Sequence, residues 1–212
     1  EWFYRAFISP FFDFLIRYRW RAVLILLLIS TYRISDLVLG VIANVFYVDM
    51  GFTKVEVAAI SKVFGVIMTL LGAGLGGLMM IRHGVMKVLF LGGLLSALTN
   101  LLFSLLAIMG HNISLLTLVI CLDNLSGGIA SAAFIAYLSS LTNVSYSATQ
   151  YALFSSVMVL FPKFLGGFSG VMVDSTGYSY FFMITAAMGI PVLILIVLAN
   201  RWIPSSGYRT SN

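Results

Sequence analysis

Six apolar stretches, each long enough to cross a bilayer, occupy almost the whole chain after Arg21. A spanning helix needs about 20 mostly apolar residues at a rise of 1.5 Å per residue. Apolar residues make up 61% of the sequence and charged residues only 9%. A soluble domain of this length could not bury so much apolar surface in one core. The sequence therefore predicts an all-α polytopic membrane protein.

The chain divides into three expected parts, which are an interfacial segment or linker at 1–20, a six-helix unit at 21–202 and a short tail at 203–212. Residues 1–20 mix aromatic side chains with arginines, which is typical of an amphipathic segment on a membrane surface. Because Glu1 rather than Met begins the sequence, we expect a fragment, a processed product or an interrupted reading frame. The expected helices cover residues 22–48, 55–80, 86–109, 115–142, 148–173 and 179–201.

Basic residues gather in the loops on one side of the predicted helices. Lys54 is the only Lys or Arg in the loops of the other side. The positive-inside rule then predicts that both termini and the loop at Arg82 are cytoplasmic. An even number of spans also requires both termini on one side. The basic residues of the predicted cytoplasmic side are Arg5, Arg17, Arg19, Arg21, Arg82, Lys87, Arg201 and Arg209.

Several classes of site are excluded by composition. Cys121 is the single cysteine, so the chain has neither an intramolecular disulfide nor a CxxC motif. His83 and His111 form no HExxH zinc signature. The basic residues form no aromatic-interleaved patch, which argues against a nucleic-acid partner. We expect no metal and no cofactor.

The second and fifth predicted helices share two features. Thr53 to Glu56 and Ser147 to Gln150, 94 residues apart, both have the pattern of a capping box. Further along, Gly72-x-x-x-Gly76 and Gly166-x-x-x-Gly170 recur at the same offset. Small residues at this spacing let two helix backbones approach closely, so we interpret these glycines as packing sites.

These matches indicate that helices one to three, roughly 21–110, are repeated by helices four to six, 115–201. An odd number of helices per repeat inverts the second copy in the membrane. Inverted three-plus-three repeats are typical of secondary transporters, whose binding site lies near the bilayer midplane. The predicted fold is thus a six-helix unit made of two inverted three-helix repeats.

Five charged side chains fall inside the predicted spans: Arg33, Asp36, Lys62, Asp123 and Lys163. A charge at the bilayer centre costs roughly 2.5–3.5 kcal/mol on insertion scales, so such a residue faces a cavity or a partner. Arg33 and Asp36 are three residues apart and can pair on one helix face. The third and sixth helices contain no interior charge, so we expect them to lie outermost and to face lipid.

A structural interpretation of these charges stays open. The Arg33–Asp36 pair could neutralise itself and bind nothing, and Asp123 could bond a neighbouring helix. The long stems of Lys62 and Lys163 could carry their charges to the membrane surface.

Gly77, Ile81, Arg82 and Gly84 form a loop pattern that resembles the loop motif of the major facilitator superfamily. Ile81 stands where that family usually has Asp. A twin of the motif occurs at Gly170, Asp174 and Gly177, and it keeps the acid. Members of the superfamily consist of two six-helix halves, so the resemblance implies that this chain corresponds to one half, the second.

Within the superfamily, the sequence resembles the AmpG-type permeases over roughly residues 9–200. The most specific segment is Ala148-Thr149-Gln150-Tyr151-Ala152-Leu153. The resemblance implies import of anhydromuropeptides across the bacterial inner membrane, with an amino-terminal six-helix half or a second copy as partner. The other segments that carry it are 9–14 with Arg17, 32–36, 51–56, 123–128 and 133–138.

The resemblance also implies site residues. The solute would be a sugar linked to a short peptide with carboxylates, and Arg33, Lys62 and Lys163 are the cations expected to bind them. Asp36 and Asp123 are expected to couple protons, because burial favours a protonated carboxyl group and a nearby cation favours the charged form. The full set of expected solute contacts is Arg33, Asn44, Tyr47, Lys62, Asn124, Gln150, Tyr151 and Lys163.

Two other functions stay open. The chain could be a non-transporting remnant or accessory subunit that needs a six-helix partner. It could also be a six-span intramembrane enzyme, but a serine protease of that kind needs a histidine base on a facing helix. His83 and His111 fall in loops at opposite membrane faces, and no GxSG segment occurs. We therefore predict that the chain is not an enzyme.

Overall fold

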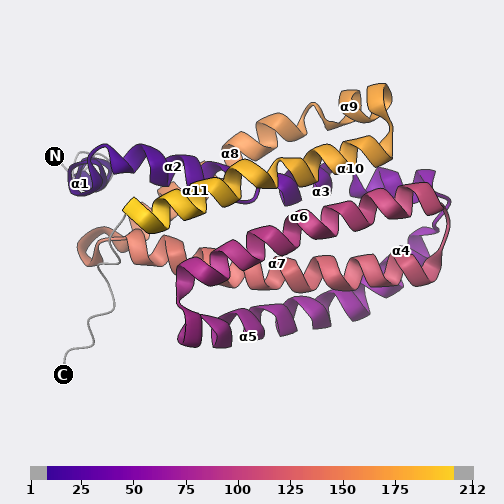
Figure 1. Cartoon of the computed structure of the whole chain (residues 1–212), viewed down its shortest axis with the longest axis horizontal. Coiled ribbons are helices and arrows are strands. Elements are labelled where there is room, and N and C mark those ends of the chain that lie inside the picture. The colour runs from indigo at the N-terminus through magenta and orange to yellow at the C-terminus, as the bar shows by residue number, and fades with distance from the viewer. Residues whose placement is uncertain (1–8, 203–212) are drawn as a thin grey trace.

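The computed structural model describes residues 9–202 (Figure 1). The predictions for residues 1–8 and 203–212, Arg5 and Arg209 included, lie outside the described residues. Within the described range, six helical segments are long and apolar enough to cross a membrane, which confirms the predicted all-α six-helix fold. These spans are Arg21–Asp49, Lys54–His83, Val85–Met109, Ile113–Leu141, Val144–Thr176 and Tyr178–Trp202.

Most spans consist of more than one helical element. Helix α1 (Ser9–Tyr18) precedes the first span, which comprises α2 (Arg21–Thr31) and α3 (Ile34–Asp49). The second span joins α4 (Lys54–Ile60), a π-helix (Ser61–Gly65) and α5 (Val66–His83). The third and fourth are α6 (Val85–Met109) and α7 (Ile113–Leu141). The fifth comprises a 3-10 turn (Val144–Tyr146), α8 (Ser147–Gly166) and α9 (Ser169–Thr176), and the sixth α10 (Tyr178–Ala187) and α11 (Gly189–Trp202).

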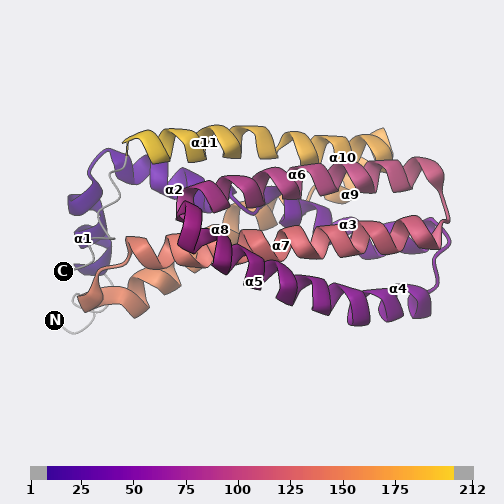
Figure 2. The ribbon, with the colours of Figure 1, turned by 60° about the horizontal axis from the view of Figure 1, so that its bottom comes forward.

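The spans run up and down a single elongated bundle (Figures 1 and 2). Helix α1, the end of α11 and the α5–α6 and α7–α8 connections lie at one end. The α3–α4, α6–α7 and α9–α10 connections lie at the other. Arg17, Arg82 and Arg201 thus share one end, and Lys54 lies at the opposite end.

Packing between the spans follows an inverted two-fold pattern. Helix α5 of the second span packs on α7, and α8 of the fifth span packs on α2 and α3. The second and third helices of each unit are joined through one glycine, with φ/ψ of 82°/162° at Gly84 and 80°/164° at Gly177. Only glycine adopts this positive φ readily. The two matching turns lie at opposite ends of the bundle, as an inverted repeat requires (Figure 1).

Glycines set the closest contact in the bundle. A Cβ atom at Gly72 of α5 would lie 2.2 Å from the carbonyl oxygen of Leu125 in α7, and one at Gly128 would lie 2.3 Å from that of Thr69. The interpretation of Gly72 as a packing site is confirmed. The match in the second unit is partial, because a Cβ at Gly166 would meet Val41 at 3.0 Å, whereas one at Gly170 would meet nothing within 4 Å.

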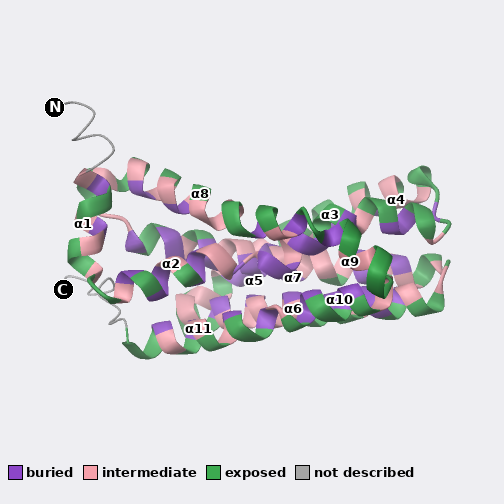
Figure 3. Cartoon of the chain, turned by 90° about the horizontal axis from the view of Figure 1, so that it is seen from above, coloured by how far each residue is buried: buried purple, intermediate pink, exposed green. Residues whose placement is uncertain are grey.

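The expected lipid-facing position of the third and sixth helices stays a prediction, because burial within the chain does not distinguish contact with lipid from contact with another protein. In α6, 50% of the residues in its apolar window are buried within the chain, against 17% in the second and fifth spans (Figure 3). Helix α6 packs against α7 on one side and α10 and α11 on another. Its buried residues with small or polar side chains supply these contacts. These residues are Gly92, Ser96, Thr99, Asn100 and Ser104.

Replacing Gly72 by Ala should lower stability, because the new methyl group would force α5 away from the α7 backbone. Overpacking of this kind costs about 1–3 kcal/mol. Gly74→Ala is a matched control on the same helix, because its Cβ would meet nothing within 4 Å. Thermal unfolding of the detergent-solubilised protein should show a lower Tm for Gly72→Ala and an unchanged or slightly higher Tm for Gly74→Ala. Equal Tm values for the two variants would contradict the close contact.

Candidate functional site

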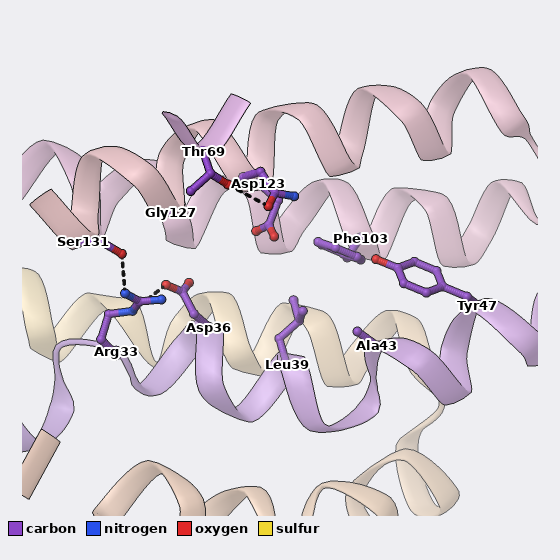
Figure 4. Close-up of a pocket in the computed structure, with 12 residues that line it drawn as sticks. Arg33, Asp36, Leu39, Ala43, Tyr47, Thr69, Phe103, Asp123, Gly127 and Ser131 are labelled. Carbon is purple, nitrogen blue, oxygen red and sulfur yellow. Dashed lines mark hydrogen bonds and ion pairs between the residues drawn. The ribbon is translucent and has the colours of Figure 1, made fainter. Parts of the chain in front are cut away.

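A polar cavity of about 320 Å³ lies between α3 and α7 and is completed by one residue each from α5 and α6 (Figure 4). Asp36 lies near the middle of the first span and Gly127 near the middle of the fourth. The cavity therefore lies at the depth where transporters of inverted repeats bind their solutes. It is lined by Arg33, Asp36, Leu39, Gly40, Ala43, Tyr47, Thr69, Phe103, Asp123, Asn124, Gly127 and Ser131.

Arg33 stands at an interruption of the first span, since α2 ends at Thr31 and α3 begins at Ile34. Its Nε lies 3.2 Å from Oδ2 of Asp36, which confirms the predicted pair. Its Nη1 donates a 2.7 Å hydrogen bond to the hydroxyl oxygen of Ser131 on α7. The guanidinium thus links the two helices that form the cavity.

The ion pair leaves some hydrogen-bonding capacity unused. Within the described residues, Nε of Arg33 and Oδ1 of Asp36 are buried and have no hydrogen-bond partner. Hydrogen bonds to charged groups contribute about 1.5–3 kcal/mol each, so unused capacity of this kind is available for a ligand or a proton. The Arg33–Asp36 contact is therefore an electrostatic pair without an aligned hydrogen bond.

Helix α6 supports both carboxylates of the cavity. The Ser96 hydroxyl lies 3.5 Å from Oδ2 of Asp36, at the limit of hydrogen-bond distance. Thr99, three residues further along, donates a 3.2 Å hydrogen bond to Oδ1 of Asp123. No salt bridge to Asp123 occurs among the described residues. The two carboxylates therefore differ, because Asp36 has a cation beside it and Asp123 has not.

The rest of the lining is amide, hydroxyl and aromatic. Thr69 of α5 donates a 3.1 Å hydrogen bond to Oδ1 of Asn124, whose Nδ2 donates to the carbonyl oxygen of Ile120 at 2.8 Å. Beyond Asp123, the rings of Tyr47 and Phe103 lie with centroids 6.4 Å apart (Figure 4). The cavity thus has a charged end and an aromatic end. Across residues 9–202, no group of three or more His, Cys, Asp or Glu side chains could hold a metal ion.

No family model matches the chain. It is 35% identical to AmpG 4 of Rickettsia felis over 201 residues, which are 95% of the chain and 48% of that protein. It is 33% identical to AmpG 1 of Rickettsia bellii over 180 residues, which are 84% of the chain and 44% of that protein. It is 32% identical to the anhydromuropeptide permease of Escherichia coli K12 over 198 residues, which are 93% of the chain and 40% of that protein.

The chain is a homologue of the AmpG transporters. It matches the carboxy-terminal half of these proteins and spans less than half of the length of the relatives compared. With six apolar spans, this AmpG homologue is a multi-pass membrane protein.

The structure brings together five of the predicted site residues of the AmpG homologue. Arg33, Asp36, Tyr47, Asp123 and Asn124 all line the cavity. They come from two helices that are distant in sequence but antiparallel in the bundle. The lining residues Thr69 and Phe103 and the supporting residues Ser96 and Thr99 were not among the predicted site residues. The spacing of Gly92, Ser96, Thr99 and Phe103 along one face of α6 was the available signal.

Five other predicted contacts do not line this cavity, and their roles in solute binding stay predictions. Asn44, Lys62 and Lys163 are exposed, because they lie on the outward faces of their helices. Tyr151 is half-buried against the hydrophobic core. Gln150 is buried at the start of α8, at the end of the bundle where α1 lies.

Gln150 fastens α1 to the AmpG homologue's helix bundle. Its Nε2 donates to the carbonyl oxygen of Pro10 and to Oδ2 of Asp13, both at 2.9 Å. Its Oε1 accepts from the backbone N–H of Asn143 at 2.7 Å and from Arg17 at 3.2 Å. Because the nitrogen and the oxygen of this amide are both hydrogen-bonded within the protein, Gln150 has a structural role.

The predicted second capping box is consequently wrong. The first box is present, since the side chains and backbones of Thr53 and Glu56 bond reciprocally. Ser147, however, is the first residue of α8 rather than its cap, and Gln150 bonds α1 instead. The side chain of Asn143 caps the 3-10 turn before α8.

The residues of the loop motif do not contribute to the cavity. Gly77 lies within α5, the exposed Arg82 lies in its last turn, and Gly84 joins α5 to α6. Their twins Gly170, Asp174 and Gly177 lie in or after α9, at the opposite end of the bundle, and all three are exposed.

Gln150→Ala should loosen α1, because four hydrogen bonds to a buried side chain are lost. The cost should be about 1–3 kcal/mol, as for other buried polar groups left unpaired. Ser147→Ala is the matched control, and it should be nearly neutral because Ser147 is not the cap. Thermal unfolding and tryptic cleavage after Arg17 should both respond to Gln150→Ala alone. If Ser147→Ala lowered the free energy of unfolding by about 1 kcal/mol, the result would support the predicted capping box instead.

Proposed function

We propose that the chain is one half of a secondary active transporter that imports anhydromuropeptides, or similar cell-wall sugar-peptides, by alternating access. The observation that carries this proposal is the polar mid-span cavity of Arg33, Asp36 and Asp123 in a homologue of an anhydromuropeptide permease. Both three-helix units line the cavity, so a relative movement of the units would change its shape. The relatives are named transporters or permeases, and we propose transport without catalysis.

The partner in this proposal is an amino-terminal six-helix half. The curated relatives are more than twice as long as the matched region. The second and fifth spans bury only 17% of the residues in their apolar windows within the chain, so they are available to contact such a half. A cavity of about 320 Å³ is at the small end of the range for ligand sites, about 300–1,000 Å³, and a second half would enlarge it. The expected location is the bacterial inner membrane, with the Arg-rich end of the bundle in the cytoplasm.

Proton coupling is assigned to Asp36 through its pairing with Arg33. When Asp36 is charged, its Oδ2 pairs with Nε of the Arg33 guanidinium at a distance of 3.2 Å. A proton on Asp36 removes that charge and leaves Arg33 available to a carboxylate of the solute. Proton and solute would then bind together, which is the requirement for symport. Tyr47 and Asn124, in the same cavity, are the proposed uncharged contacts.

The test is uptake of labelled anhydromuropeptide in cells that lack their own permease. The chain is expressed alone and, in parallel, with an AmpG-type amino-terminal half. Uptake in either strain supports the proposal, and the comparison shows whether the second half is needed. Absence of uptake in both, with membrane insertion confirmed, would contradict transport of this solute and favour a remnant or accessory subunit.

Asp36→Asn should abolish accumulation driven by a proton gradient, because an amide cannot accept and release the proton. It should retain exchange of labelled for unlabelled solute, since Asn resembles the protonated acid and leaves Arg33 available. Asp49→Asn, on the same helix and outside the cavity, is the control, because its amide oxygen can still accept the hydrogen bond from Tyr178. Normal gradient-driven accumulation by Asp36→Asn would rule out the proton role.

A further inference from the structure

The charges of the cavity are unequal. Arg33 is the one cation among the lining residues, and its guanidinium is paired with Asp36. Asp123 projects into the cavity from the facing helix α7 (Figure 4). Its side chain accepts from the Thr99 hydroxyl, and the described residues offer it no basic partner. The cavity therefore holds a carboxylate that the protein itself does not neutralise.

An unneutralised carboxylate inside a helix bundle is costly unless it meets a cation or a proton. Away from the span ends, the other basic residues of the spans are Lys62 and Lys163, and both are exposed and outside the cavity. The bundle thus provides no internal cation for Asp123. A cation or a proton must therefore come from outside the chain.

We propose that Asp123 binds a primary ammonium group of the transported solute. This inference rests on the proposed function and defines its substrate class as sugar-peptides that carry an amine. Arg33, once released by protonation of Asp36, receives a carboxylate of the same solute. The carboxylate and the ammonium group of a zwitterionic solute would then bind to Arg33 and Asp123, which face each other across the cavity from α3 and α7.

The surroundings of Asp123 suit an ammonium group. Such a group has three N–H donors and needs several acceptors. Oδ1 of Asn124 accepts from Thr69 and has a second lone pair, so it can accept from the ammonium as well. The rings of Tyr47 and Phe103 line the cavity beyond Asp123, where an aromatic face attracts a cation.

The experiment compares two probes that differ only in this charge. One is an anhydromuramyl tripeptide with a carboxy-terminal lysine, and the other is the same compound acetylated at the lysine Nε. Binding is measured on the chain in lipid nanodiscs, alone and together with an AmpG-type amino-terminal half. The wild-type protein should bind the amine about 10-fold or more tightly than the acetylated form, as expected for a charge-assisted hydrogen bond.

Asp123→Asn should reduce this preference to near unity and leave the affinity for the acetylated probe unchanged. Asp123→Glu, which keeps the charge, should restore part of the preference. Asp49→Asn removes a carboxylate outside the cavity and should keep the full preference. Together these variants separate recognition of charge from a general loss of structure.

Three results would overturn the ammonium site. Equal binding of both probes by the wild-type protein would contradict the ammonium site but would not contradict the proposed function. Equal loss of both probes in Asp123→Asn would assign Asp123 to structure or to proton transfer instead. Binding of neither probe by the wild-type protein, with or without the second half, would contradict the proposed solute class and the ammonium site with it.

Discussion

Holding charge inside an apolar bundle is the constraint on which this structure depends. Hydrocarbon offers no hydrogen bonds, so every interior charge needs a protein partner, a ligand or water. Helix α6 supplies the uncharged partners, with Ser96 near Asp36 and Thr99 bonded to Asp123. To reach both, α6 must lie against α3 and α7 at once. Its contacts with both helices follow from that requirement.

Close packing of the second span connects the fold to the site. Gly72 and Gly128 remove the side chains that would keep α5 and α7 apart. The contact places Thr69, less than one turn from Gly72, within 3.1 Å of Oδ1 of Asn124. A movement of α5 relative to α7 would therefore change the polar lining directly. The same glycines that stabilise the bundle position a wall of the cavity.

The cavity suits a solute that carries both signs of charge. The Arg33–Asp36 pair can open to a carboxylate when it takes up a proton, and Asp123 remains as an acceptor for a cation. Opposite charges on facing helices also orient the solute, because each end has one complementary site. In the proposed function, such a division between α3 and α7 would link solute binding to the arrangement of the two three-helix units.

The sequence alone determined the all-α class, the six spans, the Thr53–Glu56 capping box and the Arg33–Asp36 pair, because each depends on apolar length or on residues within one helical turn. It also nominated Asp36, Asp123, Tyr47 and Asn124, since polar groups in long apolar helices are conspicuous. Only the tertiary structure decided that α6 contacts both α3 and α7, that Gln150 anchors α1, and that Lys62 and Lys163 lie outside the cavity. These outcomes depend on which face of each helix meets which neighbour, and helical spacing along one chain does not specify the neighbour.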